Sequence, residues 1–428
     1  MSRPDTSAGR ALPESRRGLT GLARRSLASA AARAGRWPWW AQVAGAYTVA
    51  RVISACIFMA AALHQGVNPW FPPKPDYWHF INIWDARWYG EVVQNGYPSQ
   101  LPVDESGNVQ ENAWAFYALF PMLGRAVAAM TGLHPAVALT FIAMAAGLGA
   151  ALVAYCLFRH IAGHHTALWA VVFFSTFPVA AILQVPYAES LNLLLLASAL
   201  LLVVQRRYLW AMPVVVLMCL SRPTGVPFAA MAGLLLVYRL WQRNRPAPPG
   251  TRPRLPHSGR ELVTLAALAV VSGFSALLWP AIAWAATGDP AAYTKTETVW
   301  RGHDLVPFKP WFDTGIQLFG PVLGVLAPFV FVALFALFMT SAPVVALGTE
   351  LRLWCVCYMG YLLVFLHPQT STFRMLLPLF PLALSAALIS RSRAYRGAVV
   401  TMFLLLQIVW IVWLWAWAPL PGGGDYPP

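Results

Sequence analysis

Residues Pro135–Phe158 read PAVALTFIAMAAGLGAALVAYCLF and contain no charged side chain. A helix needs about 20 apolar residues to cross roughly 30 Å of hydrocarbon, so this segment is long enough to span a bilayer. Similar runs recur along the chain, and hydrophobic residues fill 58% of its 428 positions. Only 11% are charged, against about 25% in soluble globular proteins. The sequence therefore predicts an all-α integral membrane protein.

Counting such runs predicts a polytopic bundle of about eleven transmembrane helices. We expect the spans near 41–63, 135–158, 167–184, 189–204, 208–221, 224–240, 262–286, 316–340, 352–366, 374–390 and 397–418. Residues 114–131 are apolar as well, but Pro121 and Arg125 interrupt them. This interruption favours an interfacial or re-entrant helix over a further crossing.

The formal charge is +14, and a basic chain can indicate nucleic-acid binding. Here the arginines instead lie in short turns between apolar runs. With a cytoplasmic N-terminus, 21 of the 30 basic residues lie inside and 12 of the 16 acidic residues lie outside. The positive-inside rule therefore predicts this orientation, and no nucleic-acid partner is expected. The arginine-, alanine- and proline-rich composition points to a bacterial protein, and so to the plasma membrane.

The same pattern divides the chain. Residues 1–40 form a basic tail with eight arginines, expected to be disordered and cytoplasmic. Residues 41–420 form the transmembrane domain, and 421–428 a short extracytoplasmic tail. Two large extracytoplasmic loops lie at about 64–113 and 287–315. Loops this long are usually functional or disordered, and aromatic residues among their charges predict ordered structure on the membrane surface.

The first outer loop contains IWDARWYGEVVQNGYP, Ile83 to Pro98. Asp85 lies there among Trp84, Trp88 and Tyr89, with Glu91 close behind. Partial desolvation by aromatic rings makes a carboxylate a more effective general base. Rings beside an acid also suit a sugar, whose apolar face stacks while its hydroxyls donate. The alternative is an interfacial aromatic belt around a solvated aspartate.

Four further ionisable residues stand at the ends of apolar runs. They are Glu189 in VPYAES, Arg222 in SRPTG, and His367 and Arg374 in HPQTSTFRMLLPLFP. Ionisable groups at membrane depth are costly and are often functional. Arginine suits phosphate because its planar fork binds two oxygens at once. The alternative for each is a structural residue that pairs or snorkels at a helix end.

Other chemistries have no support in the sequence. All five cysteines lie inside apolar runs, which predicts free thiols. No histidine, cysteine or acid spacing fits a zinc site, and no phosphate-binding glycine motif is present. We therefore expect neither a metal nor a cofactor.

Several motifs together resemble the PIG-V-like mannosyltransferases, relatives of GPI mannosyltransferase 2. WDARWYGEVVQNGYP resembles the first-loop motif of that family, and AFYALFPMLGR resembles the segment that follows it, in diverged form. PYAESLNLLLL resembles the YTES-type motif, with Ala188 in place of threonine. LSRPTG resembles the arginine-containing turn, and FRMLLPLFPL the late segment. The matches occur in the expected order from Trp84 to Pro381.

This resemblance implies a GT-C-type bundle that takes a sugar from a polyprenyl-phosphate carrier on the extracytoplasmic face. It implies mannose as the sugar and Asp85 as the catalytic acidic residue. Inversion at the sugar needs one general base and a cation that steadies the leaving phosphate. Arg374 or Arg222 would serve the second purpose, with Glu189 in support. The implied partners are the lipid-linked donor, a glycolipid or glycan acceptor, and membrane lipids.

Three other functions remain open from the sequence. A transporter or flippase for a lipid-linked sugar would also need many spans, although no internal repeat is evident. A related GT-C enzyme that moves another sugar, such as arabinose or glucose, is also compatible with the sequence. A structural membrane subunit would have no chemistry at Asp85. The acceptor and the oligomeric state are not indicated.

Overall fold

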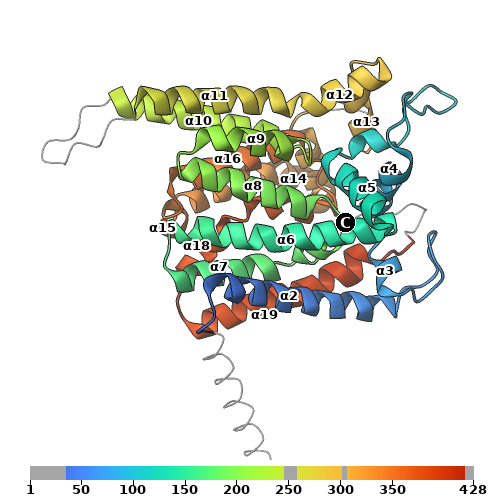
Figure 1. Ribbon diagram of the computed structural model, residues 1–428, viewed down its shortest axis with the longest axis horizontal. Helices are drawn as coiled ribbons and strands as arrows, with labels where there is room; N and C mark the ends of the chain where they lie inside the picture. Colours follow the sequence, from blue (N-terminus) through green and yellow to red (C-terminus); the bar gives the residue numbers. More distant parts are fainter. Residues whose placement is uncertain (1–34, 245–257, 301–305, 420–428) are drawn as a thin grey trace, which may run out of the picture.

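The computed structural model describes residues 35–244, 258–300 and 306–419 (Figure 1). Its helices are α2 (Trp39–Ala62), α3 (Tyr77–Phe80), α4 (Asp85–Asn95), α5 (Leu119–Thr131), α6 (Pro135–Arg159), α7 (His164–Thr176), α8 (Glu189–Val204), α9 (Tyr208–Cys219), α10 (Gly225–Asn244), α11 (Gly259–Ala276), α12 (Leu278–Thr287), α13 (Ala292–Val299), α14 (Lys309–Met339), α15 (Ala342–Val345), α16 (Gly348–Phe365), α17 (Thr372–Met375), α18 (Leu382–Ile389) and α19 (Arg393–Val409). Short turns of other helix types are η1 (Ala113–Ala115), η2 (Ala180–Gln184), η3 (Leu377–Leu379) and η4 (Trp410–Trp415).

The fold is an all-helical bundle. Within the described residues the only β-type pairing is one isolated bridge, between Val103 and Val109. The long helices run side by side along the longest axis, with α6 packed on α8 and α10 packed on α11 (Figure 1). The prediction of an all-α fold is confirmed.

Five helices in the described part are long and apolar enough to cross a membrane, or six if one bent pair counts as a span. Each of the eleven predicted segments nevertheless coincides with a helix or with consecutive helices. The segment predicted to be interfacial or re-entrant contains α5, a separate helix of thirteen residues. The positions of the apolar helices were therefore predictable, while the number of crossings stays a prediction.

Helix α14 is a helical hairpin, not one long span. Gly320 has a left-handed φ of 79° and interrupts the helix, and Pro321 begins the second arm. The rings of Trp311 and Phe331 stack across the hairpin with centroids 5.7 Å apart. A Cβ on Gly315 would lie 2.4 Å from the carbonyl oxygen of Gly324, so the arms touch through glycine. The predicted span 316–340 therefore begins within the first arm, and most of it is the apolar second arm that follows the turn.

A buried arginine stabilises a break between two helical segments, α7 and η2. Arg51 lies in the middle of α2, and its guanidinium donates to the carbonyl oxygens of Ser175, at 2.6 Å, and Ala180. These carbonyls lie where α7 ends and η2 begins. Backbone groups freed by a break inside a bilayer need internal partners, and Arg51 supplies them. The chain then continues directly to Tyr187 and Glu189.

The two long loops that the sequence predicts to be extracytoplasmic lie at one end of the bundle. They carry α3, α4 and η1 in the first loop and α13 in the second (Figure 1). The loops are linked by a pair of buried side chains, because Asn112 donates to the hydroxyl of Thr296 at 3.0 Å. Both loops therefore contain helices in their described parts, and their position on a membrane surface stays a prediction. The predicted tails at 1–40 and 421–428 fall mostly or wholly outside the described residues.

An ionic cluster lies at the end of the bundle opposite these two loops. The buried Arg239 on α10 pairs with Glu261 on α11 and, at 2.8 Å, with Glu350 on α16. It also donates to the hydroxyl of Tyr208 on α9. One guanidinium thus ties four helices together, away from the loops.

Candidate active site

Asp85 is the first residue of α4, so its carboxylate lies at a helix N-terminus, where the helix dipole favours negative charge. The preceding residue, Trp84, has a φ of 58°, a conformation that is costly for a bulky side chain. It is held there because its indole donates to the carbonyl oxygen of Trp415 at 2.8 Å. The backbone N–H of Asp85 donates to the hydroxyl of Tyr187 at 3.1 Å. The packing of Trp84 thus fixes the point where Asp85 enters the cavity.

Glu189 begins α8 and is almost fully buried. One turn later on the same helix, Asn192 donates to the hydroxyls of Ser221 and Thr224, each at 2.9 Å. These two residues flank the turn between α9 and α10 that carries Arg222. A single helix face therefore presents the acid and also holds the arginine turn in place.

Arg374 is carried by a broken helix. Residues Thr372–Leu379 and Leu382–Ile389 form a pair bent by 74°. Two hydrogen bonds from α16 fix the first part: Tyr358 donates to the carbonyl oxygen of Met375, and Trp354 donates to that of Pro378, each at 2.7 Å. Because of this bend, the segment does not continue as one straight helix, and Arg374 stays at the cavity.

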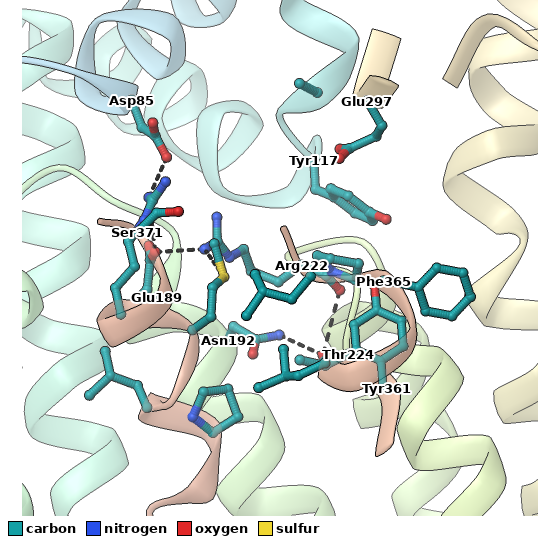
Figure 2. Close-up of a pocket in the computed structure, with 18 of the residues that line it drawn as sticks. Asp85, Tyr117, Glu189, Asn192, Arg222, Thr224, Glu297, Tyr361, Phe365 and Ser371 are labelled. Carbon is teal, nitrogen blue, oxygen red and sulfur yellow. Dashed lines mark hydrogen bonds and ion pairs between the residues drawn. The ribbon is translucent and has the colours of Figure 1, made fainter. Parts of the chain in front are cut away.

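The four charged side chains form one network (Figure 2). Arg374 pairs with Asp85 and, at 3.3 Å, with Glu189. Glu189 also accepts from Arg222 at 2.7 Å. The guanidinium of Arg374 lies over the ring of Tyr187, 5.4 Å from its centroid. Two carboxylates and two guanidiniums give a net charge of zero.

The network lines one cavity, which also has an aromatic wall. Figure 2 shows Asp85 and Glu189 toward one side and Tyr117 and Glu297 toward the other. The aromatic wall comes from Tyr117, Trp300, Tyr361 and Phe365. The cavity therefore joins the ionic network at one end to an aromatic wall with the acidic Glu297 at the other.

The tyrosines of this cavity are poor candidates for the base. Burial raises the pKa of Tyr89 above its usual value, and burial likewise raises the pKa of Tyr117. Both remain protonated near neutral pH and can donate a hydrogen bond. The better candidates for a base in the lining are Asp85, Glu189, Glu297 and His367.

The structure brings most of the sequence-predicted residues together. Asp85, Tyr89, Glu189, Arg222, His367 and Arg374 all line the cavity. Both arginines thus line the same cavity as Asp85, and the roles of these residues stay predictions.

Three other candidates lie outside the cavity wall among the described residues. Trp84 turns toward Trp415, as described above. Trp88 stacks on Phe116, with ring centroids 5.6 Å apart. Glu91 is exposed and accepts from Asn95, one helical turn away, at 2.5 Å. Trp88 and Glu91 lie on α4, where successive side chains point to different faces of the helix, so they do not face the cavity as Asp85 does.

Sequence reasoning missed Tyr187 and Asn192. Both stand within three positions of Glu189, and Asn192 lies on the same helix face as Glu189. A polar side chain inside the apolar run LNLLLL was the available signal for Asn192. No comparable signal separates Tyr187 from other tyrosines near a helix end.

Comparisons with known proteins give a limited result. No family model matches the chain, and no curated protein matches it. A solved oligosaccharyltransferase of Archaeoglobus fulgidus is similar in its apo form, with a TM-score of 0.43 and 14% identity over 86% of this chain and 56% of that one. The same enzyme with an inhibitory peptide and a dolichol-phosphate gives a TM-score of 0.41 and 13% identity, over 86% and 55%. The chain thus spans about half the length of these proteins, and its function has to be inferred from the cavity.

Proposed function

We propose that this protein is a membrane glycosyltransferase that moves a sugar from a polyprenyl-phosphate carrier to an extracytoplasmic glycolipid or glycan. Following the family resemblance, the sugar is mannose and the transfer inverts its anomeric centre. The observation that carries the proposal is one cavity that holds a carboxylate, two arginines and an aromatic wall. A phosphate-linked sugar needs each of these groups.

The arginines suit the phosphate of the donor. Arg222 and Arg374 lie on the same side of the cavity, joined through Glu189. Arginine binds phosphate oxygens through its fork of N–H donors. As the bond between the anomeric carbon and the phosphate oxygen breaks, the electron pair stays on the phosphate, and a nearby guanidinium stabilises that charge.

Asp85 serves as the general base. It removes the proton from the acceptor hydroxyl while the acceptor oxygen bonds to the anomeric carbon from the opposite face. Before the donor binds, Asp85 is paired with Arg374. Phosphate oxygens compete for the same guanidinium, so donor binding would weaken this pair and leave the carboxylate available to the acceptor. The reaction would then begin only when the donor is in place.

Glu189 contributes to sugar binding. Its Oε1 accepts from both arginines, while its buried Oε2 has no hydrogen-bond partner among the described residues. A buried acceptor left unsatisfied is costly. A sugar hydroxyl would donate to this oxygen and remove that cost.

The test is transfer of label from polyprenyl-phosphate-mannose in membranes that contain the protein. Asp85→Asn keeps the side-chain shape and should lower the rate by about 10²–10⁴-fold, equal to roughly 3–5 kcal/mol of barrier. Glu91→Gln is the matched control, since Glu91 lies on the same helix but outside the cavity, and it should stay near wild type.

The outcomes separate the parts of the proposal. Near wild-type turnover of a folded Asp85→Asn protein would exclude Asp85 as the base. Transfer from a carrier that bears a different sugar would replace mannose but keep the mechanism. If no carrier supports transfer, and the protein instead moves a lipid-linked sugar across the bilayer of vesicles, the protein would be a transporter and not a glycosyltransferase.

A further inference from the structure

A second pocket lies at the end of the bundle away from α4 and α5. It is formed by the turn between α8 and α9 and by the start of α11 (Figure 1). Its lining residues are Arg206, Arg207, Tyr208, Leu209, Trp210, Ser258, Arg260, Glu261 and Thr264. The distribution of arginines predicts that this end faces the cytoplasm. None of these residues takes part in the proposed transfer reaction.

The charge of this pocket is positive. Arg206, Arg207 and Arg260 line it, against Glu261 as the one acid among the described lining residues. Glu261 is already paired with the buried Arg239 beneath it. Its contact with Arg206 is longer, at 3.4 Å, and the Arg206 side chain is largely exposed. Glu261 thus pairs with at least two arginines, and the described lining of the pocket has three arginines against this one carboxylate.

Two of the arginines are available to a ligand. The side chains of Arg207 and Arg260 are exposed and have no hydrogen-bond or ion-pair partner among the described residues. They come from different elements, the α8–α9 turn and the first turn of α11, and both line the pocket. Two guanidiniums in one pocket suit one phosphate group, whose oxygens accept from both.

An apolar rim adjoins the arginines. Leu209 is 55% exposed and Trp210 is 72% exposed, at the beginning of α9. Tryptophan is enriched where a membrane protein meets the headgroup region. The side chains beside the phosphate-binding arginines thus have the chemistry to contact the glycerol and upper acyl chain of a lipid.

We infer that this pocket binds the headgroup of an anionic phospholipid of the surrounding leaflet. The phosphodiester lies between Arg207 and Arg260, and the acyl chains run past Leu209 and Trp210. A free phosphate ion would use the same arginines but would gain nothing from the apolar rim. The inference does not depend on the proposed transferase activity.

The test uses the purified full-length protein, titrated with dioleoylphosphatidylglycerol or dioleoylphosphatidylcholine and analysed by native mass spectrometry. We expect retention of phosphatidylglycerol and weaker retention of phosphatidylcholine. Each arginine near an anionic lipid surface contributes about 1 kcal/mol, so Arg207→Gln with Arg260→Gln should weaken phosphatidylglycerol binding roughly thirtyfold. Replacing both residues by lysine should retain most of the binding.

Arg391→Gln with Arg393→Gln is the matched control. It removes the same charge from exposed arginines at and just before the start of α19, outside the pocket, and should leave lipid binding unchanged. Equal retention of both lipids, or equal loss in the control and the test variants, would overturn the inference. Displacement of phosphatidylglycerol by an equal concentration of inorganic phosphate would show a phosphate site in place of a lipid site.

Discussion

Replacing Arg374 by methionine should lower both the stability of the protein and its rate of sugar transfer. A second substitution at Asp85 should partly restore the stability but not the transfer. Arg374 is the only described residue that pairs with both Asp85 and Glu189. Its removal leaves the four-residue network with a net charge of −1. Asp85→Asn alone leaves +1, and the double variant is neutral again. Stability should therefore fall in each single variant and partly recover in the double variant, while transfer stays lost in all three.

The expected magnitude comes from burial. The side chains of Arg374, Asp85 and Glu189 are 8%, 15% and 5% exposed. Removing one partner of a buried ion pair costs about 3–5 kcal/mol. Glu189 keeps Arg222 as a partner at 2.7 Å, and Asp85 retains some solvent, so we expect about 3 kcal/mol for Arg374→Met, at the lower end of that range. Contacting pairs show coupling energies of roughly 0.5–3 kcal/mol, and this pair should exceed 1 kcal/mol.

The measurement is a double-mutant cycle on the free energy of unfolding in mixed micelles, with transfer assayed on the same samples. Arg125→Met combined with Asp85→Asn is the control cycle. Arg125 donates only to backbone carbonyls of α4, at Val92 and Val93, so its effect should add to that of Asp85→Asn. Additivity within about 0.5 kcal/mol for Arg374 and Asp85 would refute the coupled network. Retained transfer in Arg374→Met would remove Arg374 from the donor site.

Further predictions concern support, topology and the far ionic cluster. Asn192→Leu removes the hydrogen bonds that hold the turn of Arg222 and should destabilise the fold by about 1–3 kcal/mol. The KM for the lipid-linked sugar should rise more than kcat falls. An unchanged KM would argue against a positioning role for Asn192. A cysteine at the exposed Ser106, in a cysteine-free background, should react with an impermeant thiol reagent in intact cells, whereas labelling only after lysis would reverse the orientation. Arg239→Gln breaks a buried pair and should cost about 3–5 kcal/mol in stability, but transfer per folded molecule should not change, and a selective loss of kcat would link the two ends of the bundle.

The helices were predictable because their signal is local. Each span needs enough consecutive apolar residues, and this can be judged from the residues of that segment alone. The hairpin of α14 shows the limit of this reasoning. The second arm is strongly apolar and the first carries Lys309 and Asp313, but neither composition reports that the chain reverses between them. The local signal was the pair Gly320–Pro321, where a left-handed glycine precedes a residue that begins a helix well.

The candidate site was predictable only in part, for a related reason. Ionisable residues are conspicuous in apolar surroundings, so Glu189, Arg222 and Arg374 could be identified one by one. Their contacts depend on helix breaks and on packing between distant segments, as when Arg374 reaches Asp85 across 289 positions of sequence. Trp84 illustrates the opposite case. Its place beside Asp85 suggested a sugar contact, but its side chain turns away to hold the backbone.

The two ionic clusters show which property separates a candidate functional arginine from a structural one. Arg239 and Arg374 are both buried, and each pairs with two carboxylates. Burial and pairing therefore do not distinguish them. The difference lies in access: Arg239 itself lines neither of the two pockets described above, although its partner Glu261 borders the second, whereas Arg374 and both of its acids line the first. A charged ligand would compete for Arg374 without unpacking any helix, and that access makes its cluster the stronger candidate for chemistry.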